Sequence, residues 1–233
     1  MNDRFVSVVL PVHNQADHIG QVLSDYVETL QKFLKRFELV VVLNGCSDNS
    51  KLVCEELARK NDSIVVIESA QAGWGAAVKC GLERARGEVL CYTNSARTSS
   101  DVLARSIEIA VGTPEMVVKV NRKIRENWRR RLGSLLYNLE CRALFDLPTW
   151  DINGTPKVFP RSCSKLLSLR SNDDLIDAEF NMVCKQANYS IVELPAICYR
   201  RHGGKSTTNY MSALKMYVGA YRLWKENRTP ANS

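Results

Sequence analysis

The sequence has 233 residues, of which 45% are hydrophobic, so the chain can bury one sizeable core. No segment reaches the roughly 18 apolar residues that span a bilayer. The N-terminus has acidic and polar residues around one short apolar run, which predicts a first strand rather than a signal peptide. We therefore expect a soluble protein that is not exported. The eight cysteines are scattered, with no C-x-x-C pair, which favours buried reduced thiols over disulfides or a zinc site.

The formal net charge of +7 is concentrated in one stretch of the chain. Residues 119–131, KVNRKIRENWRRR, contain seven basic residues and one acid. Such a run is typical either of a solvated helix face or of a surface for an anionic ligand or an anionic membrane. No recognised nucleic-acid-binding motif accompanies it, so we expect no nucleic-acid partner.

The first half of the chain alternates strands and helices. Apolar runs predict strands at 5–10, 39–43, 64–67 and 89–92, and helical spacing of apolar residues predicts helices at 16–37, 51–60, 76–85 and 102–111. Gly87 is expected to end the third helix as a left-handed cap. This alternation indicates an α/β fold with a doubly wound, mostly parallel sheet and helices on both faces.

The second half of the chain is less regular. Strands are predicted at 116–120 and 190–199, and residues 150–159 are predicted to form a turn that leads into a short strand. Helices are predicted at 131–145, 162–169, 177–187 and 210–225. The last helix has Tyr210, Leu214, Tyr217, Tyr221 and Trp224 at helical spacing, with basic residues between them. It either docks on the preceding domain or lies at a membrane interface. We divide the chain into a domain of residues 1–208 and a C-terminal amphipathic aromatic helix and tail of residues 209–233.

Short polar motifs follow the predicted strands in a recognisable order. They are PVHNQ at 11–15, GCSDNS at 45–50, GWGAAVKCGL at 73–82, DING at 151–154, DAE at 177–179, ELP at 193–195 and RHGGKS at 201–206. Together they resemble the motifs of an inverting family-2 glycosyltransferase of the GT-A fold. The nearest resemblance is to the dolichyl- or polyprenyl-phosphate mannose and glucose synthases.

The resemblance implies transfer of a sugar, with inversion, from a nucleoside-diphosphate sugar to a polyprenyl or dolichyl phosphate or to a saccharide hydroxyl. It implies a cytoplasmic protein, which for a lipid acceptor would contact the cytoplasmic face of a membrane as a peripheral protein. The residues that it implies for the donor are Pro11, His13, Gln15, Asn44, Gly45, Asp48, Gly73, Trp74, Ala76, Lys79, Asn94, Ser95, Ala96 and Arg97. Those for the acceptor or its phosphate are Lys119, Arg122, Arg130, Arg131, Asn153, Gly154, Gly204 and Ser206. The implied catalytic residues are Asp177, Glu179 and Arg201.

The sequence departs from the family at acidic positions. The D-x-D metal motif aligns with Asn94-Ser95-Ala96, the paired acids after the second strand align with Leu43-Asn44, and Gln15 replaces a glutamate. A downstream arginine of the family appears as Leu135. Neutral ligands hold a divalent ion weakly, so the sequence requires no cofactor, and a weakly bound Mg²⁺ or Mn²⁺ is the alternative. Cations would then offset the charge of the diphosphate; Arg97 is one candidate, and an exposed loop charge is its other interpretation.

Several residues keep two interpretations. Asp177 and Glu179 either contact the acceptor or act as base, or they only begin a helix. Trp74 either stacks on a base or sugar or packs on the neighbouring helix, and His13 and His202 are expected in exposed or packed turns. The second hypothesis for function is a catalytically reduced homologue that binds a nucleotide-sugar or serves as a scaffold or regulatory protein.

Overall fold

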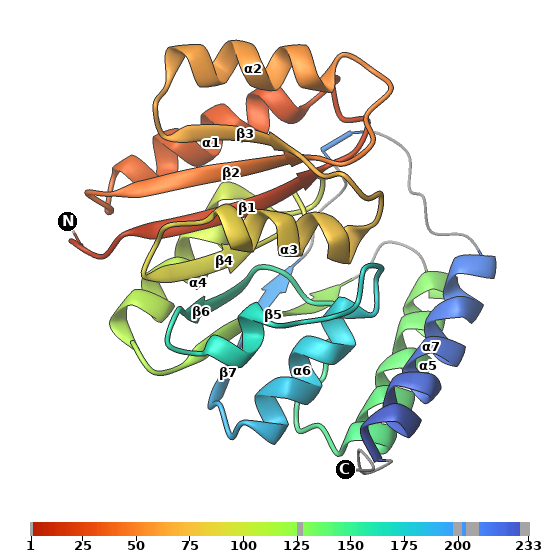
Figure 1. Cartoon of the computed structure of the whole chain (residues 1–233). Coiled ribbons are helices and arrows are strands. Elements are labelled where there is room, and N and C mark those ends of the chain that lie inside the picture. Colours follow the sequence, from red (N-terminus) through yellow and green to blue (C-terminus); the bar gives the residue numbers. More distant parts are fainter. Residues whose placement is uncertain (1, 125–127, 198–201, 204–209, 229–233) are drawn as a thin grey trace.

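The structure is a computed structural model that describes residues 2–124, 128–197, 202–203 and 210–228 (Figure 1). Strands and helices alternate in the order expected from the sequence. In chain order they are β1 (Val6–Val12), α1 (Ile19–Gln31), β2 (Phe37–Leu43), α2 (Ser50–Lys60), β3 (Ile64–Glu68), α3 (Trp74–Arg84), β4 (Val89–Tyr92), α4 (Ser100–Gly112), β5 (Val117–Ile124), α5 (Trp128–Phe145), β6 (Lys157–Pro160), the 3₁₀ helix η1 (Ser164–Leu167), α6 (Ile176–Gln186), β7 (Ile191–Ile197) and α7 (Tyr210–Arg228).

The strands form one sheet in the order β3-β2-β1-β4-β6-β5-β7. β1 pairs in parallel with β2 and β4, β2 with β3, and β5 with β7, whereas β6 runs antiparallel to both β4 and β5. The carboxyl ends of every strand but β6 therefore lie at one edge, and β6 begins there. This arrangement confirms the predicted doubly wound, mostly parallel sheet.

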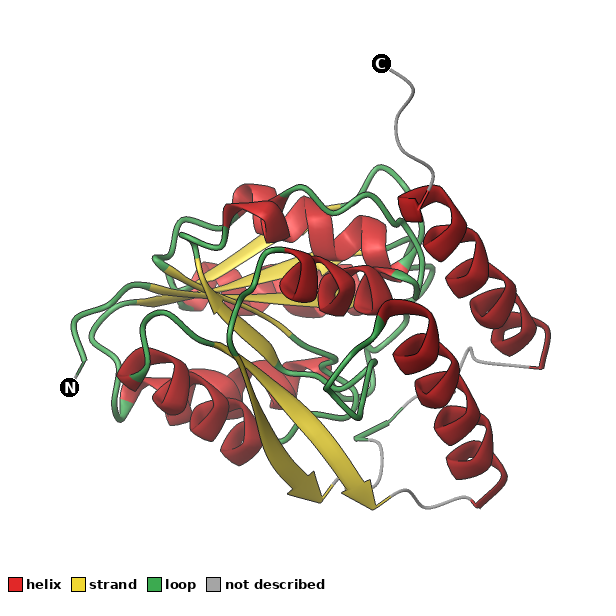
Figure 2. Cartoon of the chain, turned by 90° about the horizontal axis from the view of Figure 1, so that it is seen from below, coloured by secondary structure: helices red, strands yellow, loops and turns green. Residues whose placement is uncertain are grey.

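Alternation along the strands divides the core into two layers. Val8, Val41 and Cys91 face a layer that includes apolar residues of α1 and α4, and Val9, Val42 and Leu90 face a layer that includes α3 and α6. Figure 2 shows helices on both sides of the sheet. The central strands are buried on both faces, which is why they read as continuous apolar runs. The seven cysteines of the described residues are free thiols, and five of them are buried, as expected.

A third apolar cluster joins α5 and α7 to α6 at one side of the molecule (Figure 1). The rings of Tyr137 and Tyr217 meet edge to face with their centroids 5.6 Å apart, and the Tyr217 hydroxyl donates to the Gly133 carbonyl. The last helix is therefore docked on its neighbours, which was one of its two interpretations. Within the described residues, none of the helices has the length and apolar character needed to cross a bilayer.

Three local predictions need correction. α1 ends at Gln31, because the residues that follow it turn and exchange backbone hydrogen bonds with Asn2. Gly87 is not a helix cap: α3 ends at Arg84, and a Cβ at Gly87 would lie 2.5 Å from the Ser7 nitrogen, so close backbone approach requires the glycine. The predicted helix at 162–169 is only the short 3₁₀ turn η1.

Candidate active site

The loop after β1 is tied to the loops after β2 and β4. The His13 Nδ1 lies 2.7 Å from the Asn44 carbonyl, and the Asn14 side-chain carbonyl accepts from the Ser47 amide. Gln15 is buried, and its Oε1 accepts from the Ser95 hydroxyl at 2.8 Å. The Ser95 hydroxyl also lies 3.4 Å from the Pro11 carbonyl. The position where the family has a glutamate is thus used to hold the turn after β4.

The loop after β2 contains Asn44, Gly45 and Asp48. Asn44 exchanges two hydrogen bonds of 3.1 Å with the backbone of Gly73, which joins this loop to the start of α3. Gly45 has a φ of 63°, a conformation that favours glycine. The Asp48 carboxylate accepts from the Ala16 amide and from the amide and hydroxyl of Ser50. Desolvation alone would raise the pKa of Asp48, but these hydrogen bonds outweigh it and lower the pKa.

The start of α3 packs against residues 171–173. Gly73 has a φ of 135°, and a Cβ there would lie 2.3 Å from the Asn172 carbonyl oxygen, which accepts from the Ala76 amide. Trp74 is half-buried and meets Tyr92 edge to face at 6.4 Å, and its indole N–H has no partner among the described residues. The Lys79 ammonium donates to the Arg170 carbonyl. The ring therefore packs against a residue of strand β4 rather than only against a neighbouring helix, and its N–H is buried.

The turn after β4 holds the positions of the family's metal motif. The Asn94 side chain accepts from the Ala96 amide, Ser95 and Ala96 are buried, and Arg97 is half-buried. The His202 amide donates to the Ala96 carbonyl at 2.9 Å, and the His202 Nε2 lies 3.0 Å from the Thr98 carbonyl. The chain just before α7 therefore binds the turn, which sequence spacing alone did not reveal.

The chemistry of this turn does not suit a divalent cation. Mg²⁺ and Mn²⁺ prefer anionic oxygen ligands. Asn94, Ser95 and Ala96 offer only neutral atoms, and the side chains of Asn94 and Ser95 already bond to Ala96 and Gln15. No group of three or more histidine, cysteine, aspartate or glutamate side chains with the geometry for a metal ion occurs within the described part of the chain.

A buried ionic cluster lies directly beneath this turn. Lys157 and Tyr92 are paired across β6 and β4, and both contact Asp177 at the start of α6. Lys157 is fully buried, and desolvation lowers its pKa although Asp177 opposes the change. Burial, followed by the charge of Asp177, raises the pKa of Tyr92 well above its usual value. The sequence interpretation included Asp177 but missed Lys157 and Tyr92, although a lysine beginning an apolar strand was a signal.

The implied acceptor-side cations Lys119 and Arg122 are used within the protein. Lys119 is fully buried, donates to the Asn181 side-chain carbonyl at 2.9 Å and lies 3.5 Å from Glu193. Burial lowers the pKa of Lys119 to about 8. Arg122 donates two hydrogen bonds from its guanidinium, of 2.6 and 2.7 Å, to Asp151. Lys119 thus joins β5 to α6, and Arg122 joins β5 to the loop before β6.

Of the remaining predicted residues, some belong to the described part of the chain and the others lie outside it. Glu179 is buried, and its carboxylate accepts from the amides of Arg170 and Ser171, at the loop that packs on α3. A Cβ at Gly154 would lie 1.8 Å from the Val120 carbonyl, while the neighbouring Asn153 is half-buried. Arg201, Gly204 and Ser206, and the side chains of Arg130 and Arg131, lie outside the described residues. The structure brings the described donor-side residues together at the carboxyl edge of the sheet.

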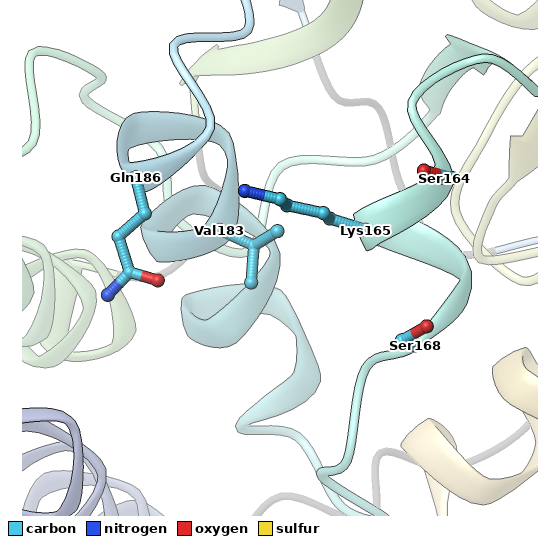
Figure 3. Close-up of a pocket in the computed structure, with 5 residues that line it drawn as sticks. All are labelled: Ser164, Lys165, Ser168, Val183 and Gln186. Atoms are coloured by element: carbon cyan, nitrogen blue, oxygen red, sulfur yellow. The ribbon is translucent and has the colours of Figure 1, made fainter. Parts of the chain in front are cut away.

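A shallow pocket of about 280 Å³ lies between η1 and α6, apart from the donor-side residues (Figure 3). Ser164, Lys165, Ser168, Val183 and Gln186 line it. Because η1 follows the carboxyl end of the antiparallel β6, the pocket lies toward the opposite edge of the sheet. Nothing among its lining residues points to a ligand.

Two curated relatives have sequences similar to this chain. Undecaprenyl-phosphate 4-deoxy-4-formamido-L-arabinose transferase of Edwardsiella ictaluri is 28% identical over 138 residues, which are 58% of this chain and 42% of that protein. Glycosyltransferase AglD of Haloferax volcanii is 28% identical over 204 residues, which are 82% of this chain and 32% of that protein. The chain thus spans less than half the length of these relatives.

Solved structures resemble the whole chain. Glucosyl-3-phosphoglycerate synthase from Mycobacterium tuberculosis, in complex with Mn²⁺, UDP and phosphoglyceric acid, superposes with a TM-score of 0.73 over 98% of this chain and 80% of that one. Another complex of that enzyme contains Mn²⁺, UDP-glucose and phosphoglyceric acid, with a TM-score of 0.68 over 95% of this chain and 79% of that one. At 14% identity in both cases, the likeness is one of fold, and it confirms the GT-A fold.

The family comparison covers the donor-side loops described above. The model of Glycosyl transferase family 2 matches residues 7–164, from β1 to the start of η1 and through the turn that lacks the metal-motif carboxylates. More than half of the chain is covered, and the protein belongs to glycosyl transferase family 2.

Proposed function

We propose that the protein is a glycosyltransferase that moves a sugar, with inversion, from a nucleoside-diphosphate sugar to the phosphate of a polyprenyl lipid. The membership of family 2 supports the reaction type, and the similarity to the Edwardsiella undecaprenyl-phosphate transferase supports the class of acceptor. The donor would bind at the carboxyl edge of β1, β2 and β4, where such sheets usually bind ligands. Because the acceptor is a membrane lipid, we assign the reaction to the cytoplasmic face of a membrane.

The choice of acceptor rests on the burial and hydrogen bonding of Asp177 and Glu179, the two acids that the resemblance implies to be catalytic. Asp177 and Glu179 are both buried: Asp177 is bound by Lys157 and Tyr92, and Glu179 by two backbone amides. A saccharide hydroxyl needs a general base within reach of its proton. A phosphate monoester is already ionised near neutral pH and needs none. A phosphate acceptor therefore fits this arrangement better than a saccharide hydroxyl.

The proposed step is an in-line displacement at the anomeric carbon of the donor sugar. A phosphate oxygen of the acceptor forms the new bond, the bond to the diphosphate breaks, and the nucleoside diphosphate leaves with the electron pair. Asp177 is then a positioning residue that orients Tyr92, the last residue of β4, beneath the Asn94–Ala96 turn.

We propose further that this step is independent of a divalent metal or depends on one only weakly. The neutral donor set at Asn94, Ser95 and Ala96 supports this, although the Mycobacterium enzyme is in complex with Mn²⁺. The charge that develops on the diphosphate would be offset by cations near the turn. The candidates are Arg97, which is in the turn itself, and the basic residues that neighbour His202 in the sequence, because the His202 amide donates to Ala96.

A transfer assay tests the proposal directly. The purified chain is first screened by thermal shift against nucleoside diphosphates and their sugars, with and without Mn²⁺. The donor that stabilises it is then offered with undecaprenyl phosphate in detergent, in the presence of EDTA. We expect a lipid-linked sugar of inverted configuration, and much less product with a saccharide acceptor.

Two results would overturn parts of this proposal. Transfer that needs Mn²⁺ and stops with EDTA would remove the metal-independent step. Nucleotide binding without turnover on any acceptor would favour the catalytically reduced homologue, which we do not propose because both relatives are named as transferases.

A further inference from the structure

The pair of helices α5 and α7 exposes an apolar surface that no described residue covers. On α5, four leucines at i, i+3, i+4 and i+7 are 46% to 50% exposed: Leu132, Leu135, Leu136 and Leu139. On α7, three residues at i, i+4 and i+7 are 43% to 57% exposed: Leu214, Val218 and Tyr221. We call these seven residues the leucine face. Large exposed apolar patches usually mark interaction sites.

The leucine face is separate from the residues that hold the helices to the protein. α5 packs inward through Tyr137, Cys141 and Phe145, and α7 through Ala220. On a helix with 100° per residue, the four leucines of α5 lie opposite this inward side. Each helix therefore has apolar residues on its outer side as well as on the side that packs inward.

The same two helices contain most of the net charge of the protein. α5 has four arginines and one glutamate, and α7 has four basic residues and one glutamate. Their combined formal net charge is +6, out of +7 for the whole chain. Lys215, Arg222 and Lys225 of α7 are exposed. Apolar stripes combined with a strong basic charge are typical of helices that lie in the interface of an anionic membrane.

The position of the two helices relative to the candidate active site is consistent with a membrane on the leucine face. β5 is parallel to β4, so α5 begins beyond the same sheet edge at which the Asn94–Ala96 turn lies. α7 begins a few residues after His202, which binds that turn. Both helices run side by side away from this edge (Figures 1 and 2). The first residues of the leucine face, Leu132 on α5 and Leu214 on α7, therefore lie on the helix turns that follow this edge in the chain.

A second copy of the chain fits the surface less well. A two-fold dimer through the leucine face would bring the same surface of each copy together. The two helix pairs would then oppose each other with +6 on each side. Like charges brought together in this way disfavour the contact.

We infer that the leucine face of α5 and α7 docks the protein on the anionic surface of a lipid bilayer. The inference extends the proposed function, since it names the surface on which a polyprenyl acceptor would be met. It is tested by binding alone, without donor or acceptor.

Vesicle co-sedimentation of the full chain provides the test. The vesicles are phosphatidylcholine mixed with phosphatidylglycerol, compared with phosphatidylcholine alone. We expect binding to the anionic vesicles that weakens as salt is raised. The variant Leu135→Ser/Leu139→Ser should lower the partition coefficient by roughly tenfold or more, because two leucines that would leave water are lost. Lys215→Glu/Lys225→Glu should weaken binding to anionic vesicles by a similar factor.

Matched controls separate the docking surface from general effects. Leu52→Ser changes a leucine on α2 that is equally exposed, at 52%, and Lys60→Glu changes an exposed lysine of that helix. Both controls should bind vesicles like the parent chain. Circular dichroism and urea unfolding should show that the α5 variant is folded, since its two leucines are at the surface.

Three outcomes would overturn the inference: a folded parent chain that does not bind anionic vesicles, an α5 variant that binds as well as the parent, or a dimer that the α5 variant dissociates without any vesicle binding. The last would make the face a protein interface. Loss of vesicle binding with transfer in detergent intact would count against this inference alone. Vesicle binding without transfer would count against the proposed function alone.

Discussion

The two halves of the sheet hold their functional edges together by different means. Around β1, β2 and β4, neutral groups join the loops: Asn44 with Gly73, Gln15 with Ser95, and His202 with Ala96. The Asp48 carboxylate also takes part, but its bonds come from the backbone amides of Ala16 and Ser50 and from the Ser50 hydroxyl. Around β5, β6 and α6, the contacts are buried ion pairs between lysine or arginine and carboxylates: Lys157 with Asp177, and Arg122 with Asp151. The carboxylates of this second half, Asp151 and Asp177, lie in the interior of the protein.

Because of this difference, the two halves should respond differently to mutation. A neutral hydrogen bond contributes about 1 kcal/mol and depends on backbone geometry, whereas breaking a buried ion pair leaves a charge without a partner, at a cost of about 3 to 5 kcal/mol. Charge changes should therefore affect the stability of the β5–α6 half most. Changes in backbone shape should affect the donor edge most.

Lys157→Met should have the largest effect. Among the described residues, it leaves the buried Asp177 with the Tyr92 hydroxyl as its one side-chain donor, so we expect the free energy of unfolding to fall by about 3 to 5 kcal/mol. Urea unfolding followed by circular dichroism measures this change. Lys165→Met, at an exposed position of η1, is the control and should change the free energy by about 0.5 kcal/mol or less.

The double variant Lys157→Met/Asp177→Leu sharpens the same comparison. Removing both partners removes the unpaired charge, so we expect most of the lost stability to return. A double variant as unstable as the sum of its single variants would mean that the pair is not the unit that matters.

Gly73→Ala should have the next largest effect, this time at the donor edge. An alanine would have to adopt the φ of 135°, and its Cβ would lie 2.3 Å from the Asn172 carbonyl. We expect a loss of roughly 1 to 3 kcal/mol in donor affinity, measured by calorimetry with the nucleotide that binds. Gly45→Ala, with a positive φ but open space around it, should lose less, and Gly112→Ala, with open space and no positive φ, should lose nothing. Equal losses in all three variants would contradict a role for close packing.

The donor edge could be predicted from the sequence because local signals produce it. Apolar strands followed by PVHNQ, GCSDNS and GWGAA specify turns and helix starts within a few residues, and the structure has the strands and helices expected there. Gly73 and Gly45 occur where the backbone needs them. Gly87 was wrongly predicted to be a helix cap for a related reason. A glycine can be required either by a positive φ or by close packing, and only the fold shows which of the two applies.

The ionic cluster could be predicted only in part. Lys119 and Arg122 belong to a basic run that suggested a surface, and yet Lys119 is fully buried. This could not be predicted, because its partners Asn181 and Glu193 lie more than 60 residues further along the chain. Pairing at that separation leaves no trace in a single sequence. The contact between His202 and Ala96 was inaccessible for the same reason.

The pH dependence of stability tests whether the charge of Lys119 is buried as described. Its pKa is about 8 in the folded protein, compared with an ordinary value near 10.4 in the unfolded chain. Between these values the unfolded state binds more protons, so Lys119 makes the free energy of unfolding rise with pH, by at most about 1.4 kcal/mol per pH unit. Lys119→Met should flatten this rise between pH 8 and roughly 10. An unchanged slope in the variant would mean that Lys119 does not titrate in this window.

The smallest expected effect is that of His202→Ala, which probes the link between the two halves. The backbone bond to Ala96 stays, and only the contact of the ring with the Thr98 carbonyl is lost, so we expect the free energy of unfolding to fall by about 1 kcal/mol. If the ring holds the basic segment against the turn, transfer in EDTA should fall by more than this stability loss accounts for. His202→Gln, which keeps an N–H donor, should restore part of the transfer. A variant that loses stability and keeps full transfer would leave His202 with a structural role and return the work of charge neutralisation to Arg97 or to a metal.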